Sequence, residues 1–423
     1  MNHSFLQSLN KETAFLRRAE GERGLSSGDD WDLAVMSPEN VEASLYKAFG
    51  APLIEARHRY VRRFFYDWGG VDLLPRFAWN GWPYLEEERF WKNAVLKEDE
   101  VRIPCVSHDA FIAWFCGLLH GGNYKERYDE LIYRAASEEK EEFFECLIWA
   151  FGRDWADELI AMALARHPKG ALAHVDELRK ELKWQTFCRN GLFAISPVVD
   201  HWLGELKNHM KPPFPWIAFL GPDGSGKSTV IDGIKENLLK SRIEMRHIHW
   251  RPTVRKPIPD EPGLPVTDPH GRAKRNTLLS VAALGLLFVR WWLGYIMRLL
   301  HLRAKAKVIL SDRYYLDLLV DQQRYLYGGP VWLAKLLFRF FPKPELTFVL
   351  LTDADTIFGR KTEVGKKELE RQLITYRELA KSLGDRAKVI DVGRPVEVVI
   401  ADVLAKVKEN FYERTRKRKG GSK

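Results

Sequence analysis

Beyond residue 215 the chain alternates between short apolar runs and longer segments of mixed polarity. In the longer segments, apolar side chains recur every three or four positions, which is the spacing of one helix face. Strands that alternate with helices indicate a parallel sheet covered on both faces. The sequence therefore predicts an α/β fold with a three-layer parallel sheet over 216–412, whose strands are expected at 216–220, 245–249, 307–311, 346–351 and 388–392.

The first 210 residues divide into two parts by the same criterion. Residues 107–210 are patterned almost wholly as helices. The segment Lys211-Pro-Pro-Phe-Pro215 follows, and because clustered prolines stop a helix and space domains apart, we expect a linker at 211–215. Residues 1–106 predict a small α+β domain, with helices near 4–18 and 39–49 and strands near 31–36, 57–66 and 71–76.

Composition agrees with a multidomain globular protein. A length of 423 residues suffices for two or three domains with full cores, and 46% hydrophobic with 29% charged residues is an ordinary globular balance. The N-terminus lacks the basic and apolar stretches of a secretory signal, so the expected location is the cytoplasm. The cysteines form no close pair with zinc or redox spacing, and we expect buried, reduced thiols at Cys105, Cys116, Cys146 and Cys188.

The net charge of +9 is concentrated near the C-terminus, where Arg414–Lys419 contributes five positive charges. We expect a basic, disordered tail at 413–423. Such a tail could also bind anionic lipid or nucleic acid, but a solvated end is the commoner outcome, and nucleic acid is not an expected partner.

A glycine-rich loop follows the first expected strand of the α/β domain. The sequence Gly221-Pro-Asp-Gly-Ser-Gly-Lys-Ser228 fits the pattern G-x-x-x-x-G-K-[ST], between a strand and a helix as a phosphate loop requires. Glycines let backbone N–H groups turn toward phosphate oxygens, and the helix that follows adds its positive dipole end. Lys227 can then reach the β and γ phosphates of a nucleoside triphosphate, and the Ser228 hydroxyl can ligate Mg²⁺. The residues expected to bind the phosphates of ATP are Gly221, Gly224, Ser225, Gly226, Lys227, Ser228 and Thr229.

Further charged motifs follow this loop in order. Asp312 ends the strand expected at 307–311, where a carboxylate can hold Mg²⁺ through water or orient the attacking group. Arg313 beside it would grip an acceptor phosphate bidentately. Arg251 follows the second expected strand in a stiff turn, and Arg360 lies in a basic segment that could close over the phosphates.

In these motifs the chain resembles the thymidylate kinase-like nucleoside monophosphate kinases, over residues 214–410. Gly221–Thr229 is similar to the phosphate loop of that family, including the acidic residue two positions after the first glycine, here Asp223. Asp312-Arg313-Tyr314 is similar to the family's Asp-Arg-Tyr/His motif, and Trp250-Arg251-Pro252 resembles its Arg-x-Pro motif with the middle position missing.

The resemblance implies a kinase that uses ATP and Mg²⁺. In it Lys227, Asp312 and Arg360 would be catalytic, with Arg360 as the lid arginine, and Ser228 and Asp312 would hold the metal. The family's acceptor nucleotide contacts imply that the acceptor is placed by Asp223, Arg251, Arg290 and Arg313.

Two departures from that family leave the acceptor open. The family's thymidylate-phosphorylating members carry no N-terminal extension of this length, and the insert at 251–276 is long and proline-rich. The acceptor is therefore expected to be a nucleoside monophosphate or another phosphorylated small molecule. The alternative is an ATP-binding, membrane-associated assembly or regulatory protein of polysaccharide biosynthesis without metabolite kinase activity.

The apolar run at 277–300 is long enough to span a bilayer. Spanning is disfavoured because Arg290 lies near its middle, and because a single span would separate the glycine-rich loop from Asp312. We expect a helix buried in the core or in a homodimer interface, with peripheral membrane contact as the alternative. One partly polar stripe of this helix is expected to face a cavity, namely Ser280, Ala283, Leu287, Arg290, Gly294, Arg298 and His301.

Three carboxylates stand out in the N-terminal part. Asp30 and Asp32 project on the same side of one expected strand, and Asp72 lies on another. Such a set can clamp two Mg²⁺ ions around a nucleoside triphosphate. The pattern resembles the minimal nucleotidyltransferase fold, although Arg18-Ala19 stands where that superfamily has a Gly-Ser turn, so catalysis and an inactive fold both stay open. Several other residues have no metal-site spacing and are expected to be surface or capping groups, namely His108, Asp109, His120 and His167.

Overall fold

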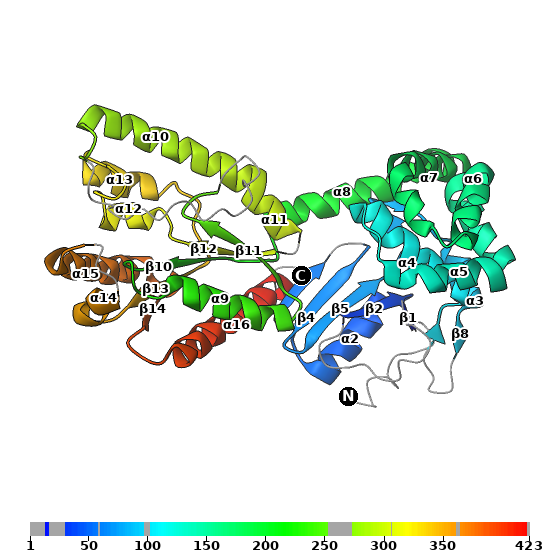
Figure 1. Ribbon diagram of the computed structural model, residues 1–423, viewed down its shortest axis with the longest axis horizontal. Helices are drawn as coiled ribbons and strands as arrows, with labels where there is room; N and C mark the ends of the chain where they lie inside the picture. Colours follow the sequence, from blue (N-terminus) through cyan, green and yellow to red (C-terminus); the bar gives the residue numbers. More distant parts are fainter. Residues whose placement is uncertain are drawn as a thin grey trace. The chain divides into compact units, whose positions relative to one another are not determined.

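The computed structural model describes residues 13–16, 30–57, 60–96, 102–252, 273–305, 307–360 and 364–420. It divides the chain into two compact units, residues 1–207 and 208–423 (Figure 1). The division lies close to the segment at 211–215 that was expected as a linker. Helix α8 (Ile195–Met210) ends at the residue before that segment, where the prolines begin.

A five-stranded parallel sheet forms the centre of the C-terminal unit. Its strands lie in the order β11-β12-β10-β13-β14, and every neighbouring pair is parallel. The three central strands are buried almost throughout, which explains their continuous apolar runs. All five expected strands are confirmed to within one residue at each end, as β10 (Trp216–Leu220), β11 (Glu244–His249), β12 (Lys307–Asp312), β13 (Leu346–Leu351) and β14 (Ala387–Asp391).

Helices cover both faces of this sheet, with α9 and α16 on one face and α10, α12 and α13 on the other (Figure 1). Between the sheet and α10, the rings of Trp216, Trp291 and Tyr314 pack with centroids 5.4–5.8 Å apart. A π-helical turn (Tyr295–Leu299) continues α10 into α11. The helices are α9 (Lys227–Lys240), α10 (Thr277–Gly294), α11 (Leu300–Ala304), α12 (Leu316–Val320), α13 (Val331–Phe338), α14 (Ala354–Arg360), α15 (Lys366–Leu383) and α16 (Val396–Gly420).

The basic C-terminus is helical rather than disordered as far as residue 420, so the expected tail at 413–423 is wrong over that range. Arg414 donates to the Pro212 carbonyl at 3.0 Å and Arg418 to the Lys211 carbonyl at 2.7 Å. Arg414 also pairs with Glu345 at 3.3 Å. Carbonyl groups outside helices and strands need donors from elsewhere, and these arginines supply them to the proline segment.

A mixed seven-stranded sheet forms the base of the N-terminal unit, in the order β3-β4-β5-β2-β1-β9-β8. Helix α2 (Pro38–Phe49) covers one face, where Trp31, Leu33 and Val35 pack against Val41 and Leu45. The strands are β1 (Thr13–Phe15), β2 (Asp30–Val35), β3 (Ile54–Arg57), β4 (Arg62–Tyr66), β5 (Gly69–Leu74), β8 (Val95–Leu96) and β9 (Arg102–Ile103), beside a separate pair β6 (Ala78–Trp79) and β7 (Trp82–Pro83).

Two sequence expectations fail in this sheet. Thr13–Phe15 was expected in a helix but pairs as a strand with Leu33–Val35. Residues 57–66 were expected to form one strand, but they hold the end of β3 and the whole of β4, which pair antiparallel with Ala56 opposite Arg63. In both places pairing with a neighbouring strand, rather than local periodicity, decides the conformation.

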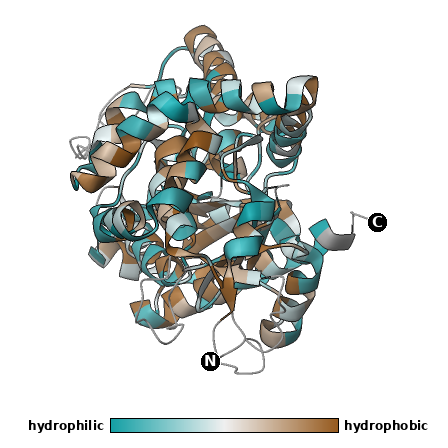
Figure 2. Cartoon of the chain, turned by 90° about the vertical axis from the view of Figure 1, so that its right-hand side faces the viewer, coloured by the Kyte–Doolittle hydropathy of each residue, from teal (hydrophilic) through white to brown (hydrophobic). Residues whose placement is uncertain are grey.

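Helices form the other layer of the N-terminal unit, and the cartoon shows hydrophobic and hydrophilic residues mixed along them (Figure 2). Their buried faces make one core that includes Phe111, Trp114 and Leu147. Cys146 is buried, as expected, but Cys105 and Cys116 are only partly buried and Cys188 is exposed. The helices are α3 (Glu87–Asn93), α4 (Val106–Gly121), α5 (Asp129–Glu138), α6 (Lys140–Leu164, interrupted at Gly152) and α7 (Val175–Asn190).

Candidate active site

The glycine-rich loop joins the buried end of β10 to the start of α9. Gly221, Gly224 and Gly226 have φ values of +147°, +83° and +76°, a region that favours glycine. A Cβ atom on Gly221 would lie 2.5 Å from the Leu350 carbonyl oxygen and 2.8 Å from Ser225 Oγ. The glycines are therefore required by the backbone itself, in a turn that leads directly into a helix N-terminus.

Lys227 is buried and folds back over this loop. Its Nζ atom donates to the carbonyls of Gly221 at 3.0 Å and Pro222 at 2.9 Å. Burial and the nearby Arg313 charge lower the pKa of Lys227. Ser225 is also buried, and its Oγ atom has no hydrogen-bond partner among the described residues. Ser228 and Thr229 lie on the first turn of α9 and are exposed.

Asp312 lies beside the loop at the end of β12. Its backbone is in register with Phe219 on β10, two residues before Gly221. One carboxylate oxygen is 3.4 Å from His249 Nδ1, and the other is buried without a hydrogen-bond partner in the described part of the chain. Burial alone would raise the pKa of this carboxyl, but the hydrogen bond from His249 and the charges of Lys227 and Arg313 hold it below its usual range.

Arg313 and Asp223 meet across the loop. Arg313 has a left-handed backbone with φ of +72°, and its N–H donates to the Phe219 carbonyl at 2.9 Å. Its guanidinium pairs with the carboxylate of Asp223, which also pairs with Arg324. Asp317, buried below, is 3.8 Å from Arg313 and accepts a hydrogen bond from Tyr376 at 2.5 Å.

A cleft of about 460 Å³ opens next to these residues. It is lined by Arg251 and Arg290, which the sequence predicted as acceptor-binding residues, and by Arg275 and Arg324, which it did not. Trp250 and Tyr325 form one wall as a stacked pair with ring centroids 4.8 Å apart. Four arginines in one cleft with aromatic and leucine walls can bind an anionic group that carries a less polar body.

Arg324 connects this cleft to the loop. It lines both the large cleft and a cavity of about 20 Å³ that is also lined by Asp223 and Arg313. Sequence reasoning missed Arg324 because it follows no recognised motif. The one available signal is its place in the polar break Asp321-Gln-Gln-Arg324, between two apolar segments. His249 was likewise missed, although its register opposite Asp312 follows from the pairing of β11 with β12.

Arg360, expected as the lid arginine, ends α14 and donates to the Val392 carbonyl at 3.2 Å. Val392 follows β14, which lies two strands from β10 in the sheet order. The structure therefore places Arg360 at the same end of the sheet as the loop but anchors it to another strand. The residue after it, Lys361, lies outside the described residues.

In the N-terminal unit, the parallel pairing of β2 and β5 sets Asp32 opposite Asp72 and Asp30 opposite Gly70. Asp72 is paired with Arg63 on the next strand, at 3.2 Å between Nε and Oδ2. The side chain of Asp30 and the segment Arg18-Ala19 lie outside the described residues. Two of the three expected carboxylates are thus shown on adjacent strands, one of them with a cationic neighbour.

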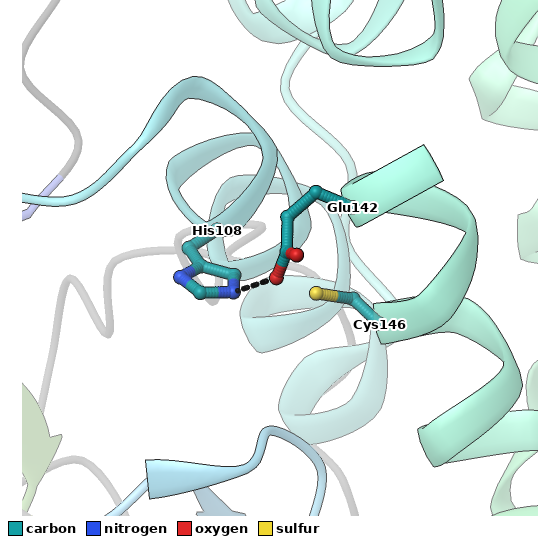
Figure 3. A group of neighbouring side chains, drawn as sticks. All are labelled: His108, Glu142 and Cys146. Atoms are coloured by element: carbon teal, nitrogen blue, oxygen red, sulfur yellow. Dashed lines mark hydrogen bonds and ion pairs between the residues drawn. The ribbon is translucent and has the colours of Figure 1, made fainter. Parts of the chain in front are cut away.

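His108 is not a surface or capping group, as the sequence suggested, but lies in the core. Its Nε2 atom is 2.9 Å from Glu142, and Cys146 lies beside them in the one group of metal-ligand side chains found among the described residues (Figure 3). Glu142 also accepts two hydrogen bonds from Arg89, at 2.7 and 2.8 Å. Because the Glu142 carboxylate is already held by Arg89, this group is best described as a partly buried ion-pair network that joins α3, α4 and α6.

No protein-family model matches the sequence. Among curated proteins, a thymidylate kinase of Symbiobacterium thermophilum is 28% identical over 213 residues, which is 48% of this chain and 96% of that protein. Together with the parallel sheet and its loop, this similarity supports a distant relationship between the chain and the kinases.

Proposed function

We propose that the C-terminal unit is an ATP-dependent phosphotransferase that moves the γ-phosphoryl group to a nucleoside monophosphate or another phosphorylated small molecule. The observation that carries this proposal is the pairing of β10 with β12. It puts the glycine-rich loop beside Asp312, next to an arginine-lined cleft. In this proposal the loop is the phosphate cradle, Asp312 is the metal-binding carboxylate and the cleft is the anion-binding site, and phosphoryl transfer needs these three parts together.

In this proposal the loop amides and the N-terminus of α9 bind the triphosphate, and Lys227 exchanges its loop carbonyls for phosphate oxygens. The carboxylate of Asp312 and the hydroxyl of Ser228 are the hard oxygen ligands that Mg²⁺ prefers. The Asp312 oxygen that finds no hydrogen-bond partner within the described ranges fits that role. Mg²⁺ bound by these two groups would neutralise part of the negative charge of the phosphates. Arg360 would complete the lid by leaving the Val392 carbonyl.

The acceptor would lie in the cleft with its phosphate among Arg251, Arg290 and Arg313. Its phosphate oxygen bonds to the γ-phosphorus as the bond from that phosphorus to the β–γ bridging oxygen breaks. ADP and a diphosphate monoester leave, and no net proton moves when the acceptor is a dianion. Positioning and charge stabilisation would account for most of the rate.

The test is a coupled ADP-release assay on the purified full chain with ATP, Mg²⁺ and a panel of nucleoside and sugar monophosphates. We expect at least one acceptor to stimulate ADP release. Lys227→Ala should lower that rate about 100-fold or more, because a buried cation at the transferring phosphate is lost. The matched control is Lys235→Ala on the same helix, which pairs with Asp232 on its surface and should retain the rate. A panel without any stimulating acceptor contradicts the proposal.

A second function is proposed for the N-terminal unit, namely nucleotidyl transfer. The specific observation that favours it is the register of Asp32 opposite Asp72 on adjacent parallel strands. Carboxylates so placed could bind two metal ions. Asp72 would then have to release Arg63.

This second function is tested by pyrophosphate release from nucleoside triphosphates and Mg²⁺. Asp32→Asn should abolish the signal while ADP release by the C-terminal unit continues. Pyrophosphate release that is unchanged in Asp32→Asn would exclude the N-terminal carboxylates as a catalytic centre.

A further inference from the structure

The outer face of α10 and of the π-helical turn after it is apolar. Large hydrophobic side chains are exposed along it from Leu278, which is 83% exposed, to Ile296 on the π-helical turn, which is 54% exposed. This helix is long and apolar enough to cross a membrane. Its opposite face, however, is buried, with Trp291 packed against Trp216 of the sheet. The helix therefore belongs to the folded unit and presents an apolar side outward.

Helix α13 and the turn after it extend this apolar face. Trp332 and Leu336 on the helix are exposed, Trp332 by 66%, and so is Phe340 in the turn. The indole N–H of Trp292 on α10 donates to the Phe340 carbonyl at 3.0 Å, so the two exposed surfaces are joined. We name the exposed apolar residues of 277–297 and 331–340 the α10–α13 face. A continuous exposed apolar face of this kind on a folded unit marks an interaction surface.

The charges around the α10–α13 face have one sign. Residues 273–305 contain six lysine and arginine residues, of which Arg303 is buried and paired with Glu345, and residues 331–343 contain three. Neither segment contains aspartate or glutamate. Two copies meeting through this face would bring like charges together, which opposes a homodimer. An anionic lipid surface, by contrast, attracts such residues and accepts the apolar side chains between them.

The cleft of the candidate active site shares α10 with this face. Leu284 and Leu287 line the cleft from the buried side of the helix, and Leu286 both lines the cleft and is exposed on the outer face. Arg290 lines the cleft as well and is exposed. A ligand whose phosphate lies among the arginines can thus extend an apolar body along leucines toward the α10–α13 face.

We propose that the acceptor is a phosphate monoester of a hydrocarbon chain, taken from an anionic membrane on which the α10–α13 face lies. This inference rests on the phosphotransfer proposed above. The acceptor's phosphate oxygen bonds to the γ-phosphorus of ATP as the bond to ADP breaks, and the product is the corresponding alkyl diphosphate, still anchored by its chain.

Two measurements on the full chain test this inference. The first is sedimentation with phosphatidylcholine vesicles, with and without phosphatidylglycerol. We expect binding that requires the anionic lipid and falls about tenfold or more in Ile296→Glu/Trp332→Glu, since two carboxylates would enter an apolar, anionic interface. The matched control is Ile374→Glu on α15, where the parent side chain is 56% exposed, and it should bind as the parent does.

The second measurement is ADP release with dodecyl phosphate in the anionic vesicles, compared with soluble ethyl phosphate and nucleoside monophosphates. We expect dodecyl phosphate to be preferred, and Ile296→Glu/Trp332→Glu to lose that preference while Ile374→Glu keeps it.

Three outcomes would contradict these proposals. If a soluble acceptor is turned over in a reaction that depends on Lys227, and dodecyl phosphate is not preferred, this inference is overturned and the proposed phosphotransfer stays intact. Absence of turnover with every acceptor instead contradicts the phosphotransfer itself. A dimer that dissociates in Ile296→Glu/Trp332→Glu, without loss of vesicle binding, would show that the face joins two copies and would overturn the membrane contact.

Discussion

At the residue scale, the glycine-rich loop depends on positions where a single methyl group has no room. Gly221→Ala would place Cβ 2.5 Å from the Leu350 carbonyl at a φ of +147°. We expect the unfolding free energy to fall by about 2–3 kcal/mol and nucleotide affinity to be lost, because the loop must shift to admit the side chain. Urea unfolding and titration with a fluorescent ATP analogue measure both effects.

The matched control for that substitution is Gly285→Ala. This glycine lies inside α10, where an added Cβ meets no atom of the described residues within 4 Å. Alanine is favoured in a helix interior, so stability should rise by about 0.5–1 kcal/mol. Equal effects of the two substitutions would contradict the loop geometry.

The buried histidine of the N-terminal unit predicts a dependence of stability on pH. Burial is the main cause that lowers the pKa of His108, against the opposing charge of Glu142. Below the ordinary histidine pKa of about 6.5, His108 takes up a proton in the unfolded chain but not in the folded chain. The unfolding free energy therefore decreases as the pH is lowered from about 6.5 to the lowered pKa of the folded state. We expect the slope to approach about 1.4 kcal/mol for each pH unit in that window.

His108→Gln should remove this slope, because glutamine does not titrate. Urea unfolding at neutral pH and at mildly acidic pH, in parent and variant, provides the comparison. An equally steep loss of stability in the variant would assign the pH dependence to other groups.

Single residues also show how far the sequence could predict the site. Lys227, Asp312, Arg251 and Arg290 lie in short patterns with a chemical reason for their spacing, and the structure brings Lys227 and Asp312 to one end of the sheet and both arginines into the cleft. Arg324 reaches Asp223 from 101 positions away. No local pattern encodes such a contact, because it depends on the return of the chain after α12.

At the scale of elements, the sequence predicted secondary structure correctly where a strand is buried on both faces. It failed where contacts with another segment of the chain determine the conformation. The runs of β10 and β13 are apolar throughout and could be recognised as strands from sequence alone. Thr13–Phe15 could not, since its extended form is stabilised by pairing with Leu33–Val35. The end of α16 was missed for a similar reason, as its arginines bind the segment at Lys211 and Pro212.

That end of α16 gives an element-scale prediction. Arg414→Ala removes a hydrogen bond to Pro212 and an ion pair with Glu345, both partly buried, and should lower the unfolding free energy by about 1–3 kcal/mol. Arg416→Ala, two residues away on the exposed side, should change it by less than about 0.5 kcal/mol. Thermal unfolding of the two variants makes the comparison, and similar losses would show that only the charge of the helix end matters.

At the scale of the whole molecule, the sheet, the glycine-rich loop and the arginine-lined cleft all lie within the unit formed by 208–423. We expect a fragment of residues 208–423 to fold and to bind an ATP analogue with an affinity like that of the full chain. Titration calorimetry on the fragment and the full chain measures this. A folded fragment without affinity would mean that the N-terminal unit completes the nucleotide site.

The carboxylate of Asp223, gripped by Arg313 and Arg324, has a consequence for how a ligand would enter. The Asp223 carboxylate lies between two guanidinium groups that would otherwise repel each other. A phosphate that binds there would replace this carboxylate, and the two guanidinium groups are already oriented before it arrives. A dianion should therefore displace the Asp223 carboxylate, whereas a neutral molecule could not. The arginine pair would thus select ligands by charge before the cleft selects them by shape.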